Sequence, residues 1–196
     1  MAGLIEGLKV VELSWGMPGP IAAMLLADNG ADVIKVEPPG GDPFRYYKPY
    51  HVWNRGKRSV IADLKTAEGR AFLFDLLADA DIMIESFQPG EMEKLGLGYK
   101  DLEARFPRLI HVSITGYGPD HERRDEPGYE ALVDAWLGLH NEQPGKRPGP
   151  RYISFPIAPT APPSWRPSAR WPRCARAASR AVASTSIRQW SMARWR

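Results

Sequence analysis

Short apolar runs alternate with segments of helical period along most of this chain, and this alternation narrows the folds that it can adopt. The apolar runs have the length and branched aliphatic content of buried strands, and they lie at 8–13, 32–36, 59–62, 81–85 and 109–114. The helical segments between them lie at 21–29, 67–78 and 90–95. A repeated strand–helix–strand order implies parallel strands joined by right-handed crossovers, with helices on both faces of the sheet. The pattern predicts an α/β fold with a doubly wound, Rossmann-like parallel sheet.

The loops that follow four of the predicted strands are the expected ligand-binding loops, at 14–20, 37–46, 86–90 and 115–129. Ligands of doubly wound sheets bind at the carboxyl ends of the strands, so we expect these loops to gather on one rim. The first loop contains Gly16-Met17-Pro18-Gly19-Pro20 between a strand and a helix, where dinucleotide-binding enzymes carry a glycine fingerprint. Its spacing is not G-x-G-x-x-G, and its two prolines lack the amides that cradle a pyrophosphate. Taken alone, the loop favours a tight turn without a ligand over a site for NAD.

The composition changes near residue 158, which sets the predicted domain boundary. The segment 159–196 contains eight Arg and four of the seven Trp, and it has no Leu, Gly, Lys, Asp or Glu. The net charge of the whole chain is +3, so these eight arginines leave residues 1–158 net acidic. We predict one folded domain over 1–158 and an irregular, disordered tail over 159–196, because few tail residues can bury enough apolar surface to offset chain entropy.

Two explanations of the tail composition remain open. Arg, Ala, Pro, Ser and Trp are the residues that G/C-rich coding DNA yields in a shifted reading frame, and we hypothesise a frameshift near Ala158. The alternative is a native tail that binds nucleic acid through its cations and aromatic rings. The absence of every Lys and Gly favours the frameshift, so we expect no nucleic-acid partner.

The composition also disfavours several other classes of site and location. The single cysteine, Cys174, allows neither a disulfide framework nor a thiolate metal site. The histidines show no ligand spacing, so we expect no metal; they are His51, His111, His121 and His140. The chain has no secretory signal at its start and no apolar run of the roughly 20 residues that span a bilayer. We therefore expect a soluble cytoplasmic protein without a membrane partner.

Several short motifs occur in a fixed order before residue 158. They are Gly30-Ala31-Asp32, Gly40-Gly41-Asp42, Asn54-Arg55-Gly56-Lys57-Arg58, Ser86-Phe87-Gln88-Pro89-Gly90, Gly116-Tyr117-Gly118 and Pro127-Gly128-Tyr129. Each motif is weak alone, but their number, order and spacing are specific when taken together. Over roughly 5–157 the chain resembles the family III CoA-transferases, a family that includes formyl-CoA transferase, the carnitine CoA-transferases and the α-methylacyl-CoA racemases. The resemblance implies the N-terminal part of that family's large domain.

The resemblance also implies that the chain binds CoA, in the form of an acyl-CoA substrate. The residues that it assigns to CoA are Gly16, Met17, Pro18, Lys65, Ser86, Phe87 and Lys94. The first three would contact the pantetheine arm and the thioester, because glycine permits close backbone approach and an apolar neighbour suits a thioester. The ring of Phe87 would cover the adenine, and Lys94 would neutralise phosphates near the start of the helix that follows Pro89-Gly90. Lys65 matches another lysine that contacts CoA in the family.

Each assigned side chain also has a structural alternative. Phe87 at a strand end is typical of a core residue, and the two lysines are typical of surface charges. The pair Lys57-Arg58 is typical of a solvated turn, with phosphate contact as the alternative. The resemblance places Tyr117 and Tyr129 in the substrate cleft, where packing is an equal explanation.

The catalytic residue of the family has no counterpart here. In family III transferases an aspartate carboxylate attacks the acyl-CoA thioester and forms an anhydride, and then an aspartyl-CoA thioester. Continuous spacing from the upstream motifs places this aspartate at Pro159, which has no nucleophile, so we assign no catalytic residue. The chain is expected to be an inactive, truncated relative of a transferase that moves CoA between an acyl-CoA and a carboxylic acid.

Two alternatives to that function stay open, and one further expectation concerns assembly. The alternatives are an epimerase similar to α-methylacyl-CoA racemase, and a CoA-binding module without turnover. Members of the family form interlocked homodimers. We expect the second domain and the returning C-terminal helix that such a dimer needs to be missing here.

Overall fold

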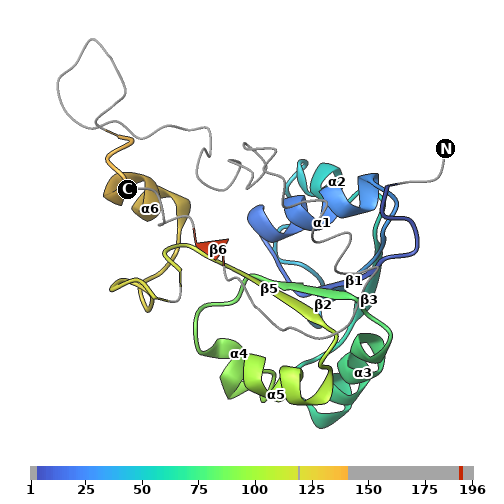
Figure 1. Cartoon of the computed structure of the whole chain (residues 1–196). Helices are drawn as coiled ribbons and strands as arrows, with labels where there is room; N and C mark the ends of the chain where they lie inside the picture. The colour runs from blue at the N-terminus through green and yellow to red at the C-terminus, as the bar shows by residue number, and fades with distance from the viewer. Residues whose placement is uncertain (1–3, 119, 141–189, 192–196) are drawn as a thin grey trace.

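A parallel sheet forms the centre of the structure, a computed structural model that describes residues 4–118, 120–140 and 190–191. The strands are β1 (Lys9–Glu12), β2 (Asp32–Glu37), β3 (Arg58–Ile61), β4 (Ile82–Glu85), β5 (Ile110–Thr115) and β6 (Trp190–Ser191). Their order is β3-β2-β1-β4-β5-β6, and every neighbouring pair is parallel (Figure 1). All five strands predicted from the apolar runs are present, so the prediction of a parallel α/β sheet is confirmed.

Helices cover both faces of this sheet, as a doubly wound fold requires. One face carries α1 (Pro18–Asp28) and α2 (Tyr50–Trp53), and the other carries α3 (Ala67–Ala78), α4 (Glu91–Lys94) and α5 (Tyr99–Arg105) (Figure 1). The last helix, α6 (Glu130–Trp136), follows β5. The sequence did not predict α2, α5 or α6. Each has seven residues or fewer, which is too short for a period of 3.6 residues to stand out.

The first helix begins earlier than the sequence predicted, at Pro18 rather than at Ile21. The first turn of a helix needs no amide donors, so Pro18 and Pro20 occupy it without losing a hydrogen bond. Pro18 therefore belongs to α1, and the loop after β1 is shorter than expected.

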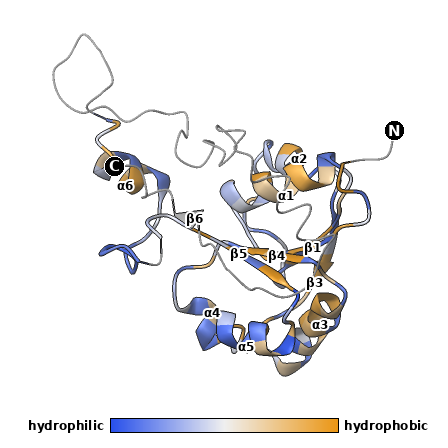
Figure 2. Cartoon of the chain, viewed as in Figure 1, coloured by the Kyte–Doolittle hydropathy of each residue, from blue (hydrophilic) through white to orange (hydrophobic). Residues whose placement is uncertain are grey.

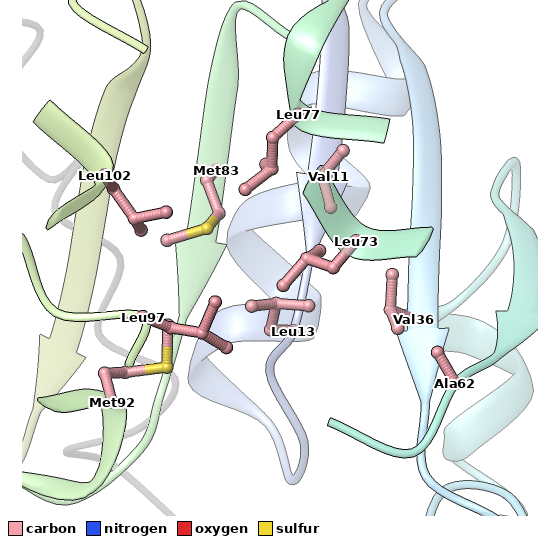
Figure 3. Packing of buried hydrophobic residues seen from close by; sticks show 10 residues of the cluster. All are labelled: Val11, Leu13, Val36, Ala62, Leu73, Leu77, Met83, Met92, Leu97 and Leu102. Atoms are coloured by element: carbon pink, nitrogen blue, oxygen red, sulfur yellow. The ribbon is translucent and has the colours of Figure 1, made fainter. Parts of the chain in front are cut away.

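Two apolar clusters, one on each face of the sheet, hold the helices in place. The cluster under α3, α4 and α5 consists of Val11, Leu13, Val36, Ala62, Leu73, Leu77, Met83, Met92, Leu97 and Leu102 (Figure 3). The cluster under α1 contains Ile5, Val10, Ala23, Leu26, Ala31, Val33 and Ile84. Successive side chains of a strand point to opposite faces, so Val10 and Val11 enter different clusters. Burial on both faces explains why the central strands are hydrophobic (Figure 2).

Only a short piece of the predicted tail is described. Trp190 and Ser191 form β6, which pairs with Ile114 and Thr115 at the end of β5. The rest of 159–196, including Pro159, lies outside the described residues, so the frameshift and the disorder of the tail stay predictions. Within the described part of the chain, no helix is both long enough and apolar enough to cross a membrane.

Candidate functional site

The order of the strands reverses between β1 and β4, and two of the predicted ligand loops meet there. The chain runs outward from β1 through β2 to β3, and then returns to add β4 and β5 on the other side of β1. Doubly wound sheets bind ligands beside such a reversal, at the carboxyl ends of the strands. At this position the amide of Trp15 donates to Ser86 Oγ at 3.3 Å, and the rings of Trp15 and Phe87 lie 6.0 Å apart. The structure therefore brings together the two loops that the sequence assigned to CoA.

The loop after β1 has its shape imposed by two glycines. Gly16 has a φ of 75°, a left-handed conformation that other residues adopt at a cost, and its open side faces the ring of Phe44. At Gly19 an added Cβ would lie 2.2 Å from Ser14 Oγ, so α1 starts directly against the end of β1. Met17 lies between the two glycines and is half-buried. The loop after β1 is therefore short, and its backbone lies close to the side chains of Phe44 and Ser14.

The loop after β4 is fixed by a buried carboxylate that the sequence analysis did not assign. Glu85 Oε2 accepts a hydrogen bond from the amide of Phe87 at 2.7 Å, and Glu85 Oε1 lies 3.5 Å from His111 Nε2. Phe87 is half-buried and packs against the cluster under α3, α4 and α5, as its structural alternative predicted. Trp15 beside it keeps 43% of its surface exposed. The ring of Phe87 thus lies between the apolar cluster and the partly exposed ring of Trp15, beside the strand reversal.

A cluster of buried charges lies directly behind the loop after β1. Lys35 Nζ donates to the carbonyl oxygen of Ser14 at 2.6 Å, and it pairs with Glu12 Oε1 at 3.2 Å and Asp42 Oδ2 at 3.0 Å. Ser14 Oγ donates to the same Glu12 oxygen at 2.7 Å. All these side chains are buried.

Lys57 completes this cluster, which corrects the expectation that Lys57 lies in a solvated turn. Its ammonium group donates to Glu12 Oε2 at 2.7 Å, to the carbonyl oxygen of Pro20 at 2.8 Å and to Asn54 Oδ1 at 3.1 Å. The side chain is only 2% exposed, because the loop before β3 folds back over α1. Burial lowers the pKa of Lys57 to about 8, although Glu12 acts in the opposite direction. Its neighbour Arg58 is exposed, as expected, and pairs with Asp32.

A second buried carboxylate anchors the loop after β2. Glu37 accepts hydrogen bonds from Arg45 Nε at 2.8 Å, from the amide of Asp42 at 2.8 Å and from the hydroxyl of Tyr50 at 2.9 Å. Burial by itself would raise the pKa of Glu37, but these donors outweigh burial and lower the pKa. Burial and the Glu37 carboxylate both raise the pKa of Tyr50. The loop at 37–46 is thereby held against the carboxyl end of β2.

The two lysines assigned to CoA phosphates are exposed. Among the described residues, neither Lys65 nor Lys94 has a side-chain hydrogen bond or ion pair. The start of α4, which follows Pro89-Gly90, is less favourable to a bound anion than the sequence suggested. Helix α4 has only four residues and carries Glu91 and Glu93 in its first turn, and Glu91 accepts the amide of Gln88 at 3.3 Å. Any phosphate contact here would therefore depend on the lysine side chains.

The two cleft tyrosines have different environments. Tyr117 is 2% exposed and lies against His121 and Trp136, with ring centroids 5.8 and 6.0 Å away. Burial raises its pKa. Tyr117 thus packs against these two rings, whereas Tyr129 is 69% exposed, and the place of both tyrosines in a substrate cleft stays a prediction. Their segments lie side by side because Gly116 and Gly128 touch: a Cβ added at Gly116 would lie 2.5 Å from Gly128 Cα.

Five carboxylates are buried among the described residues, of which one, Asp134, lies in α6 and four lie at the carboxyl ends of the strands, where each is engaged. Glu12 and Asp42 pair with lysines, Glu37 pairs with Arg45, and Glu85 accepts an amide. In the part of the chain that the structure describes, no group of three or more His, Cys, Asp or Glu residues is arranged to hold a metal ion. At this end of the sheet the described residues offer a ligand loop backbone, aromatic rings and exposed cations.

Sequence reasoning missed the residues that hold the loops, although some of them left a signal. Glu12 and Lys35 lie next to buried valines in β1 and β2, and a charge at a buried strand position requires a partner. Glu85 ends a third strand in the same way. Trp15 left no comparable signal, because an aromatic residue in a loop is equally common in packing and in binding.

Comparison with known proteins connects this site to one family. The model of CoA-transferase family III matches residues 5–163. Over 151 residues the chain is 43% identical to succinate–glutarate CoA-transferase of Agrobacterium fabrum, covering 69% of this chain and 38% of that protein. It is 38% identical over 145 residues to human succinyl-CoA:glutarate CoA-transferase, covering 69% of this chain and 33% of the relative.

A solved structure shows the same likeness. A CAIB/BAIF family protein from Brucella suis superposes with a TM-score of 0.76 at 38% identity, over 81% of this chain and 46% of that one. This chain therefore spans less than half the length of these relatives. The family match, the identity and the shared fold confirm the resemblance drawn from the sequence motifs. The chain belongs to CoA-transferase family III.

Proposed function

We propose that this chain binds CoA, as the free thiol or as an acyl thioester, beside the strand reversal between β1 and β4. The observation that carries the proposal is the junction of the loops after those strands, where Trp15 contacts both Ser86 and Phe87. Both loops follow parallel strands at their carboxyl ends, where doubly wound folds bind their ligands. Membership of a family of CoA-transferases supports CoA as that ligand.

The chemistry of the loops suits the parts of CoA. The backbone at Gly16 is approachable and Met17 is apolar, which fits a pantetheine arm and a thioester better than a charged loop would. Phe87 and Trp15 offer aromatic faces for a stacked adenine. Lys65 and Lys94 are exposed cations without partners among the described residues, so they can meet phosphates without breaking an ion pair.

We further propose that this chain alone holds CoA without exchanging thioesters. Several relatives are named as CoA-transferases, and the family resemblance implies an aspartate that attacks the thioester carbonyl and releases the CoA thiolate. Pro159 stands at that position and cannot attack. Four of the five buried carboxylates among the described residues are engaged by lysine, arginine or amide donors. Burial and Glu130 raise the pKa of the fifth, Asp134, which disfavours its nucleophilic form and supports the absence of a replacement.

Isothermal titration of the purified chain with CoA tests the binding proposal. We expect saturable binding that Phe87→Ala weakens about tenfold, since a stacked aromatic contact of that kind contributes roughly 1 kcal/mol or more. Phe72→Ala is the matched control, because Phe72 is an exposed phenylalanine on the outer side of α3. No heat of binding in the unaltered chain, or equal losses in both variants, would overturn the proposal.

The lysines and the lack of turnover have separate tests. Lys65→Ala and Lys94→Ala should each weaken CoA binding and reduce its salt dependence. Lys9→Ala should change neither, because Lys9 lies at the amino end of β1, away from the ligand loops.

A thioester exchange assay with succinyl-CoA and glutarate should give no product above the background measured without protein. Enzymatic exchange by this chain would contradict the proposal that it lacks a reactive carboxylate.

A further inference from the structure

The buried charge cluster behind the loop after β1 is the feature that the proposed function leaves unexplained. It consists of Glu12, Lys35, Asp42 and Lys57, two carboxylates and two ammonium groups with side chains at most 2% exposed. The sheet around it is apolar on both faces. Nothing in a Rossmann-like sheet requires charges at the ends of β1 and β2, so the cluster needs a reason of its own.

Stability is a poor reason for such a cluster. Moving charges out of water has a cost that their mutual attraction offsets only when geometry is good, and apolar residues of similar volume often stabilise a core at least as well. The same groups do something that apolar residues cannot do, because their donors reach backbone carbonyls at fixed positions. Lys35 donates to the carbonyl of Ser14, where the loop after β1 begins, and Lys57 donates to the carbonyl of Pro20, in the first turn of α1.

Glu12 joins these two attachments. One carboxylate oxygen meets Lys35 and the hydroxyl of Ser14, and the other meets Lys57. The backbone between Ser14 and Pro20 is thereby held at both ends by one carboxylate in β1. Gly16 and Met17 lie inside that span, at the position where the proposed function places the thioester end of CoA.

We propose that Lys57 and Lys35, held by Glu12, are positioning residues that fix the backbone from Ser14 to Pro20 for contact with CoA. The inference rests on the proposed function for its ligand, but the ordering of the loop is measurable without any ligand. The lysines act through the loop and do not touch CoA, since their ammonium groups are already occupied by protein acceptors.

The test combines amide hydrogen exchange of the free chain with CoA titration. Lys57→Met keeps most of the side-chain volume and removes the three donated hydrogen bonds. Glu12→Gln with Lys57→Met removes one negative and one positive charge together, so the buried cluster stays neutral. Lys9→Met is the matched control, a lysine at the other end of β1.

We expect exchange at the amides of Trp15 and Ile21, which donate to Ser86 Oγ and to the carbonyl oxygen of Met17, to accelerate about tenfold or more in both Lys57 variants, with β5 unchanged. CoA affinity should fall about tenfold in the same variants. The double variant should recover thermal stability relative to Lys57→Met, and yet recover neither loop protection nor affinity. A residue with a merely structural role would show the opposite, with binding restored together with stability.

The outcomes separate the inference from the function on which it rests. Unchanged loop exchange in both variants overturns the inference, whatever happens to CoA binding. Faster loop exchange with unchanged CoA affinity also overturns it, because the ordered loop would then not serve the ligand. Absence of CoA binding in the unaltered chain overturns the proposed function and with it the ligand of this loop, while the exchange result still decides whether the lysines order the backbone. If Lys57→Met fails to fold, the charge-neutral double variant gives the same decision.

Discussion

The two ends of the strands carry ion pairs in opposite environments, an Arg–Asp pair at the amino ends and a Lys–Glu pair at the carboxyl ends. At the amino ends of the strands, Arg58 of β3 pairs with Asp32 of β2, and their side chains are 65% and 49% exposed. At the carboxyl end of β1, Glu12 pairs with Lys57, and their side chains are 0% and 2% exposed. Water solvates the exposed pair, whereas the buried pair is shielded from water. The buried pair lies where the loop after β1 begins, which supports the proposal that these charges position that loop.

The difference lies in what each charge touches besides its partner. Arg58 donates only to Asp32 among the described residues, through both of its carboxylate oxygens. Lys57 divides its donors among a carboxylate, a side-chain amide and a backbone carbonyl of α1. Removing one member of the Arg58–Asp32 pair leaves an exposed partner that water can reach. Removing one member of the buried cluster leaves charges that water cannot reach.

The largest expected effect follows from breaking the buried cluster at its centre. Glu12→Ala leaves Lys35 and Lys57 facing each other without the carboxylate between them, and we expect the free energy of unfolding to fall by about 3–5 kcal/mol. Asp32→Ala at the amino edge removes the same kind of group and should cost no more than about 1 kcal/mol. Urea denaturation of both variants measures the comparison. Equal losses would remove the distinction between the two edges.

The second expected effect is a rise in the free energy of unfolding with pH, caused by the titration of Lys57. Its pKa is about 8 in the folded chain and has an ordinary value of 10.5, so between these values the unfolded chain binds a proton that the folded chain lacks. Stability must then increase with pH, with a slope of at most about 1.4 kcal/mol per pH unit. The groups that act on Lys57 are Glu12, Lys35 and Asp42, and the dominant cause is burial.

The rise should be confined to a window from about pH 8 to pH 10. Above pH 10 the tyrosines oppose it, because burial raises the pKa of Tyr99 to about 12 and raises that of Tyr50 further, so the folded chain then binds more protons than the unfolded one. Urea titrations at half-unit steps of pH measure the slope. Lys57→Met should abolish the rise and Lys9→Met should keep it; a full rise in Lys57→Met would show that another group titrates.

The sequence predicted the scaffold better than the site, for a physical reason. Strand and helix order follow from the period of apolar residues, which is local and repeated, so all five central strands were found. The short helix α2 was not found, whereas α4, which has the same length, was predicted because the Pro89-Gly90 turn marks its start. The rim was predicted as well, because parallel strands place their carboxyl ends together whatever the side chains are.

The partners of individual side chains were beyond the sequence because they depend on long-range contacts. Lys57 lies 45 positions from Glu12 along the chain, and no local pattern distinguishes it from a solvated turn lysine. Lys35 was different, since its place inside an apolar strand indicated a buried charge. For Tyr117 the sequence left packing and the substrate cleft as equal roles, and no local pattern predicted its contacts with the rings of His121 and Trp136.

The smallest expected effect concerns salt, and it sharpens the contrast between the edges. A double-mutant cycle of Asp32→Ala and Arg58→Ala should give a coupling of about 0.2–1 kcal/mol at 0.1 M NaCl. Raising NaCl from 0.1 to 1 M shortens the screening length from about 10 to 3 Å, so this exposed coupling should shrink towards zero. The corresponding cycle of Glu12→Gln and Lys57→Met should keep its larger coupling, because ions cannot enter the cluster. A buried coupling that falls with salt as steeply as the exposed one would mean that water and ions reach Lys57, and the loop after β1 would then lose the rigid support that distinguishes this edge of the sheet.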